Sequence, residues 1–193
     1  SDGQVLTSAG AGAQPAFEDA AAGGAWTILG TASISNDANV TFTGLAAHFN
    51  NYAMLGFVAS GVRLAASTNF GIYVGAGTTI DTTANYGHHA STAQSGSANY
   101  GAQAGQTEPF WKLASYGTSA GNGLSATLYL SQGVSNYATM YGSLLFFSGG
   151  DQVHGGQFVA VKNEALALGI IRFVAGSGNI TSGRITMYGI AHA

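Results

Sequence analysis

The sequence contains no cysteine, and this absence removes several kinds of site from consideration. Disulfide bonds, thiolate metal sites and cysteine nucleophiles are all excluded. Proline is rare, with two residues, whereas glycine is abundant, with 30. This balance favours turns and closely approaching backbones over long helices. Hydrophobic residues still make up 46% of the 193 residues, so the chain can bury a large core.

Charged side chains are also scarce. They make up 7% of the sequence, whereas about 25% is usual for a soluble domain. The net charge of −3 offers no basic surface, so we expect no nucleic-acid partner. A surface of hydroxyl, amide and apolar groups associates readily unless other subunits cover it. The charge deficit therefore predicts assembly with copies of the same chain; a hydroxyl- and amide-rich monomer is the alternative.

Long apolar runs are missing as well. Residues 165–175 are apolar but too short to cross a membrane, and they contain Arg172. We therefore expect no membrane insertion. The sequence begins without methionine or a signal-peptide pattern, which suggests a piece of a longer or processed chain.

What the sequence does contain is a series of short strand patterns. In residues 169–190, apolar residues alternate with Arg172 in a first run and with Thr186 in a second. A glycine-containing segment separates the two runs, which predicts a β-hairpin. Further β-branched and aromatic runs lie at residues 26–34, 40–45, 52–58, 63–66, 70–74, 108–116, 124–131, 142–148 and 157–162. This spacing predicts an all-β fold, an antiparallel β-sandwich of jelly-roll type.

Two segments depart from this pattern. Residues 1–24 lack a periodic apolar face and predict a short extended connector, which leaves residues 25–193 as the sandwich domain. Residues 82–106 contain almost no aliphatic side chain. They are long for a structureless loop, so we expect a functional excursion or an insertion at a sheet edge.

Both ends of the chain resemble a known class of proteins. Residues 3–8 (GQVLTS), 10–15 (GAGAQP) and 17–18 (FE) resemble the connector found in bacteriophage tail-fibre and related virion proteins. Residues 178–183 (GNITSG) and 188–190 (YGI) resemble the end of the β-rich domain that often follows it, and residues 40–45 (VTFTGL) with Tyr52 resemble its early strands. Residues 81–156 match nothing in that class, so no ligand and no catalytic residue can be carried over.

The resemblance implies a homotrimeric fibre tip or virion-surface protein that mediates host attachment by multivalent, non-catalytic binding. The implied partners are copies of the chain, other virion proteins, and a host-surface glycan or protein, with the chain located on the tail fibre or capsid surface. It implies no cofactor. Two alternatives stay open: a structural virion component that contacts only other subunits, such as a head decoration, head-fibre or tail-assembly protein, and a glycan depolymerase.

The candidate receptor-binding residues lie in the polar stretch. They are Tyr86, His88, His89, Tyr100 and Gln103. Aromatic faces stack on sugar rings while neighbouring amides donate and accept hydrogen bonds. For Tyr86 and Tyr100 a core position is an equal alternative, and for Trp111 the core is the preferred interpretation.

Metal binding and catalysis have weaker support. His88 and His89 could gather around a trimer axis with His154, but only one of two adjacent strand residues can point inward. No aspartate or cysteine completes a ligand set, so we expect solvated histidines and no metal.

Asp81 and Glu108 bracket the polar stretch, and glycan cleavage needs two carboxylates about 5–9 Å apart. Nothing else marks them as a pair, so we expect no enzyme.

Overall fold

The computed structural model describes residues 4–7, 14, 16–19, 25–94, 100–114, 123–133, 135–148 and 152–191. Within these ranges the chain forms fifteen strands and one short helix. The elements are β1 (Gln4–Thr7), β2 (Ala16–Asp19), β3 (Trp26–Asp37), β4 (Asn39–Thr43), α1 (Leu45–Phe49), β5 (Met54–Leu64), β6 (Phe70–Ala76), β7 (Thr79–Ile80), β8 (Tyr86–Gln94), β9 (Tyr100–Glu108), β10 (Trp111–Ala114), β11 (Leu124–Gln132), β12 (Tyr137–Ser148), β13 (Gln152–Ala165), β14 (Leu168–Ala175) and β15 (Ile180–Ile190).

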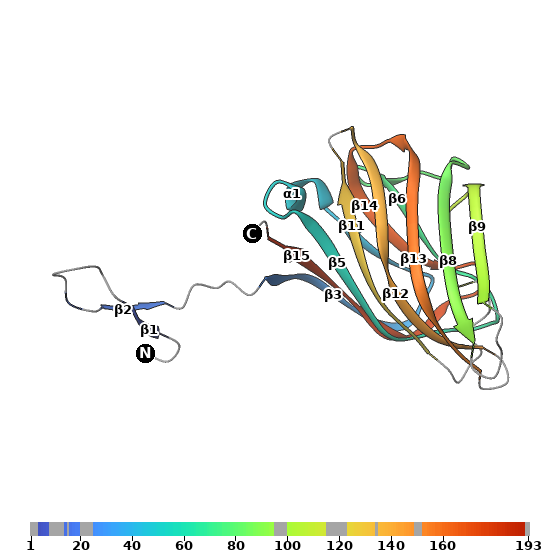
Figure 1. Ribbon diagram of the computed structural model, residues 1–193, viewed down its shortest axis with the longest axis horizontal. Coiled ribbons are helices and arrows are strands. Elements are labelled where there is room, and N and C mark those ends of the chain that lie inside the picture. Colours follow the sequence, from blue (N-terminus) through green and yellow to red (C-terminus); the bar gives the residue numbers. More distant parts are fainter. Residues whose placement is uncertain are drawn as a thin grey trace.

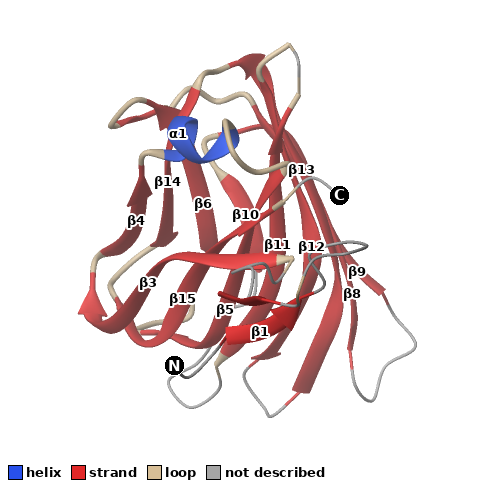
Figure 2. Ribbon diagram, turned by 90° about the vertical axis from the view of Figure 1, so that its left-hand side faces the viewer, coloured by secondary structure: helices blue, strands red, loops and turns tan. Residues whose placement is uncertain are grey.

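Two antiparallel sheets face each other (Figure 1, Figure 2). The large sheet has eight strands in the order β3-β15-β5-β11-β12-β13-β8-β9. The small sheet has the order β10-β6-β14-β4, with β7 paired to β6. Helix α1 packs against β14 of the small sheet and β5 of the large one, with Leu45 fully buried. The predicted all-β antiparallel sandwich is confirmed.

Strands β1 and β2 form a separate two-stranded sheet. Figure 1 shows them apart from the sandwich, on the side of the chain that leads into β3. Their residues fall within the predicted connector, and its role as a connector stays a prediction.

The predicted hairpin at residues 169–190 is wrong. β14 pairs with β4 and β6 in the small sheet, whereas β15 pairs with β3 and β5 in the large sheet. The segment between them crosses from one sheet to the other, and main-chain hydrogen bonds hold both of its ends: the Gly176 N–H donates to Asn69 O (2.7 Å) and the Ala65 N–H donates to Asn179 O (2.9 Å). Alternation of polarity gave the buried face of each strand correctly but carries no information about its neighbour.

The polar stretch is also more regular than expected. Most of residues 82–106 lie in β8 and β9, which form one edge of the large sheet. The expected position at a sheet edge is therefore confirmed, and a functional excursion or an insertion stays a prediction. β8 pairs with β13 from Tyr86↔Lys162 to Gln94↔His154. Main-chain hydrogen bonds form this ladder whatever the side chains are, so the lack of aliphatic residues did not prevent it.

The core between the sheets is aromatic. Phe173 on β14 lies 5.6 Å from Phe57, 6.1 Å from Phe70 and 6.4 Å from Phe42 between ring centroids. Trp111 is fully buried and its Nε1–H donates to Val161 O (3.0 Å), so its predicted core position is confirmed. Contacts of this kind join the small sheet to the large one.

Replacing Phe173 by alanine tests this core. We expect the free energy of unfolding to fall by about 3–5 kcal/mol, because the ring is lost and a cavity remains. Urea denaturation measures the change. The control is Val159→Ala, since Val159 is 52% exposed and its truncation should change stability by no more than about 0.5 kcal/mol. Equal effects for the two variants would contradict this description of the core.

Candidate functional site

Tyr86 lies in the core and not on the surface. Its side chain is fully buried, and its ring is 5.6 Å from that of Trp111 and 6.2 Å from that of Tyr73. Its hydroxyl accepts a hydrogen bond from the Val74 N–H (3.1 Å) and lies 2.9 Å from Val74 O and 2.7 Å from Asp81 O. Burial raises the pKa of Tyr86 well above its ordinary value of 10.0. The interpretation of Tyr86 as a receptor contact is wrong, because neighbouring strands cover both its ring and its hydroxyl.

Beside Tyr86 lies a buried lysine that the sequence analysis did not single out. Lys162 on β13 has no exposed surface, and its ammonium group lies 4.3 Å from the centroid of the Tyr86 ring. Its Nζ is 2.9 Å from Asp81 Oδ2, 3.7 Å from Glu164 Oε2 and 3.0 Å from Thr83 Oγ1. Lys162 and the buried Phe158 are separated by an even number of residues on β13, so both side chains point inward. This spacing could have predicted from the sequence that Lys162 is buried.

The ion pair ties the segment after β7 to β13. Burial alone would raise the pKa of Asp81, but hydrogen bonds from the Thr83 side chain and main chain, together with Lys162, hold that pKa below its ordinary value. Asn85 Nδ2 also donates to Glu164 Oε2. A lysine surrounded in this way is positioned to fix the chain, because a charge removed from water must be paired to be tolerated.

Asp81 and Glu108 do not act as a pair. Asp81 binds Lys162, whereas Glu108 Oε2 lies 2.8 Å from Lys112 Nζ. Each carboxylate thus has a different cation as its partner. The arrangement that glycan cleavage needs, two carboxylates flanking one bond, is not what these two residues form.

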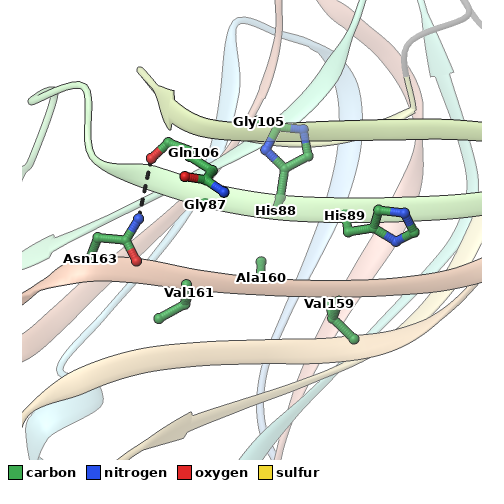
Figure 3. Close-up of a pocket in the computed structure, with 9 residues that line it drawn as sticks. All are labelled: Gly87, His88, His89, Gly105, Gln106, Val159, Ala160, Val161 and Asn163. Carbon is green, nitrogen blue, oxygen red and sulfur yellow. Dashed lines mark hydrogen bonds between the residues drawn. The ribbon is translucent and has the colours of Figure 1, made fainter.

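The two adjacent histidines point to opposite faces of β8 (Figure 3). His88 is 7% exposed and faces inward, so it is not a surface contact, and its Nδ1 lacks a hydrogen-bond partner among the described residues. Burial lowers the pKa of His88, partly countered by Glu108. His89 faces outward and is exposed. His154 pairs with Gln94, whereas His88 pairs with Ala160 six residues along β13, so the three histidines do not converge within one chain.

A hollow of about 530 Å³ lies around His89 at the edge of the large sheet (Figure 3). Its outward side chains are His89 from β8, Gln106 from β9, and Val159, Val161 and Asn163 from β13. Asn163 Nδ2 donates to Gln106 O (3.2 Å). An apolar floor beside imidazole and amide groups suits an uncharged polar ligand.

For two of the candidate receptor-binding residues, Tyr100 and Gln103, the structure describes the position of the main chain only. In β9, Tyr100 pairs with Ala93 and Gln103 pairs with Ala90. Their side chains lie outside the described residues, so their part in recognition stays a prediction.

The outer face of the large sheet carries four aromatic residues in contact, which we call the aromatic plate: Trp26, Tyr129, Tyr141 and Tyr188. The Trp26 ring lies 5.3 Å from Tyr188 and 5.7 Å from Tyr129, and Tyr141 stacks on Tyr129 at 5.1 Å with 24° between the rings. A Cβ on Gly56 would lie 3.0 Å from the Trp26 ring, so the indole lies directly over this glycine. The sequence analysis missed the plate because Trp26 on β3 and Tyr188 on β15 are far in sequence from Tyr129 and Tyr141.

Tyr141 leans across the sheet and leaves one side of its ring open. Its hydroxyl lies 3.7 Å from the sulfur of Met54 on β5, two strands away from β12. Because the ring is nearly parallel to that of Tyr129 beneath it, its outer side faces solvent, and the residue is 45% exposed. Trp26 is 37% exposed. The plate therefore offers ring surface to a ligand.

Lys162→Met tests the buried ion pair. We expect the free energy of unfolding to fall by about 3–5 kcal/mol, because Asp81 loses the cation that compensates its charge. The matched control is Lys112→Met, which breaks the partly exposed pair with Glu108 and should cost less than about 1 kcal/mol. Denaturant unfolding of both variants at neutral pH makes the comparison, and similar losses would argue against a special role for Lys162.

The buried histidines predict a pH dependence of stability. Burial lowers the pKa of both His88 and His154 from 6.5, so the unfolded chain binds protons more readily than the folded one. The stability that they contribute is present above pH 6.5 and is lost as the pH falls through their lowered folded-state pKa values. Unfolding free energies measured over this range should decrease toward acid. A double His88→Gln, His154→Gln variant should have a flatter profile, and an unchanged slope would contradict the assignment.

No group of three or more His, Cys, Asp or Glu residues that could hold a metal ion occurs among the described residues. In the same part of the chain, no helix is long and apolar enough to cross a membrane. No protein-family model matches the sequence, and the comparison with curated proteins gives no match.

Proposed function

We propose that this chain is a non-catalytic attachment domain, the tip of a virion fibre or a similar virion appendage. The observation that carries the proposal is the outer face of the large sheet. In its central strands β11, β12 and β13, the outward side chains from Ser125 to Ser131, Tyr137 to Phe147 and Gln157 to Asn163 carry no charge. They combine exposed rings with hydroxyl and amide groups, and this composition favours adhesion.

The charged residues support binding over turnover. Asp81 and Glu108 each bind a lysine, and Glu164 lies beside Lys162 and accepts a hydrogen bond from Asn85. Catalysis of glycan cleavage needs an acid and a base free to meet the same bond. Carboxylates held in ion pairs serve the fold instead.

Assembly into a homotrimer is the second part of the proposal. It has two supports, the scarcity of charged residues and the resemblance of both chain ends to phage fibre proteins. Three copies of a shallow binding surface would act together, and avidity then compensates for weak single contacts. The partners in this proposal are copies of the chain, other virion proteins and a glycan or protein of the host surface.

Native mass spectrometry and cell binding test this function with the full chain. We expect a mass of three times the 19.4 kDa of one chain and saturable binding of the labelled protein to cells in a panel of bacteria, without release of shortened glycans. Dissociation to single chains should weaken cell binding by at least about 100-fold.

Three other results would contradict the proposal. A native mass of one chain would contradict the homotrimer. Binding only to other virion proteins, and to no cell, would favour the structural alternative. Release of shortened glycans that Asp81→Asn or Glu108→Gln abolishes would show a depolymerase.

A further inference from the structure

Three members of the aromatic plate, Tyr188, Tyr129 and Tyr141, belong to a row of residues that crosses the large sheet, and the Trp26 ring lies over Gly56 of the same row. In register, Ile28 on β3 lies beside Tyr188, then Gly56, Tyr129, Tyr141, Val159 and His89 on the following strands. The last two members line the hollow of about 530 Å³ at the sheet edge. One apolar track thus leads from the plate to the amide and imidazole groups of the hollow.

A second row runs directly beside the first, two residues along every strand except β3, where a register shift makes the step three residues. Its members in register are Thr31, Thr186, Val58, Thr127, Ser143, Gln157 and Ser91. All but Val58 carry a hydroxyl or an amide. Adjacent residues on one face of a strand are about 7 Å apart, which is close to the width of a sugar ring, so a ring on the plate would have these polar groups at its edge.

A groove lies along part of the second row. This groove, of about 320 Å³, lies between β5, β11 and β12, and its outward side chains are Val58, Ser60, Ser125, Thr127, Ser143 and Leu145. Thr127 and Ser143 are two residues from Tyr129 and Tyr141, so the groove adjoins the plate. An aromatic wall beside a floor of hydroxyls can hold a saccharide through stacking and hydrogen bonds together.

Charge decides which saccharide fits. The groove, the plate and the outward side chains of the hollow contain no lysine, arginine, aspartate or glutamate. Arg184 lines an adjoining hollow of about 420 Å³, which shares Ser60 with the groove and lies on the side away from the plate. An acidic glycan on the plate and in the hollow around His89 would lose water around its carboxylates without gaining a cation there, which is costly. A neutral glycan meets no such cost.

A second copy of the chain fits this face less well. The flat outer face of another sheet could cover the plate, but it would close off the groove and leave its hydroxyls without water or new partners. The centre of a subunit interface is usually more apolar than this mixture of rings and hydroxyls. A chain of hydroxyl-bearing rings satisfies both parts of the surface.

We propose that the outer face of the large sheet binds a linear neutral polysaccharide, with sugar rings on the aromatic plate and their hydroxyls in the Thr127–Ser143 groove. This inference rests on the proposed attachment function and names its ligand class. Trp26 and Tyr141 stack on the rings, while Thr127, Ser143 and Gln157 exchange hydrogen bonds with the sugar hydroxyls. His89, Gln106 and Asn163 hold the end of the chain that reaches the hollow.

Tryptophan fluorescence provides the assay. The chain has two tryptophans: Trp26 is part of the plate, whereas Trp111 is fully buried. Hexasaccharides of β-1,4-linked glucose, xylose, mannose and N-acetylglucosamine are titrated into the full-length protein, with hexagalacturonate as the acidic comparison. We expect at least one neutral hexasaccharide to shift the Trp26 emission with saturation, and hexagalacturonate to have no effect.

Three variants locate the binding site. Tyr141→Ala should weaken binding roughly tenfold or more, because it removes a stacking surface. Thr127→Val should weaken it severalfold while keeping the shape of the side chain. Tyr137→Ala is the matched control, since Tyr137 is on the same strand, is 44% exposed and lies outside the plate. It should bind as the unmodified protein does, and thermal unfolding confirms that each variant is folded.

The outcomes separate this inference from the proposed function. Loss of binding in Tyr141→Ala but not in Tyr137→Ala supports the inference. Failure of every neutral hexasaccharide, or equal loss in both variants, overturns it; retained binding to bacterial cells would then leave the attachment function standing with another receptor. A native mass that falls to that of one chain in Tyr141→Ala alone would assign this face to a second copy and also overturn the inference.

Discussion

The burial of aromatic and aliphatic side chains between two sheets is the interaction on which the rest of the structure depends. Phe173 on β14 contacts Phe42 and Phe70 on the two neighbouring strands of the small sheet and Phe57 on β5 of the large sheet, so one ring packs within its own sheet and across the core. Each strand must present one face to this core, and alternation then sends every second residue outward. The way the core is filled therefore decides which residues of each strand lie on the outer face.

At the edge of the large sheet the balance of forces differs. β8 and β9 contribute few aliphatic residues, and main-chain pairing with β13 holds them in place. The buried contacts at this edge come from Tyr86, whose hydroxyl meets main-chain groups around Val74 and Asp81, and from Lys162, which binds Asp81. Polar groups removed from water are tolerated here because each of these two side chains has partners. Such a network fixes a single register, where a purely small-residue edge would be free to slip.

The outer face combines exposed rings with hydroxyls and almost no charge. Most soluble domains cover such a face with lysine and glutamate, which keep it from associating. Here Gly56 leaves room for the Trp26 ring over β5, and Tyr141 leans toward the same strand from the other side. The geometry gathers ring surface in one area, next to the Thr127–Ser143 groove. This arrangement is the basis of the proposed attachment function.

The sequence by itself determined the class of fold and the buried faces of β14 and β15, because alternation and composition are local properties. It also determined that Trp111 is a core residue and that only one of His88 and His89 points inward. Tertiary structure alone decided that β14 and β15 belong to different sheets, that Tyr86 is covered, and that Lys162 meets Asp81. It also decided that Trp26, Tyr129, Tyr141 and Tyr188 lie together. Each of these depends on which strands become neighbours, and strand order is set by the packing of the whole chain, which no short stretch of sequence records.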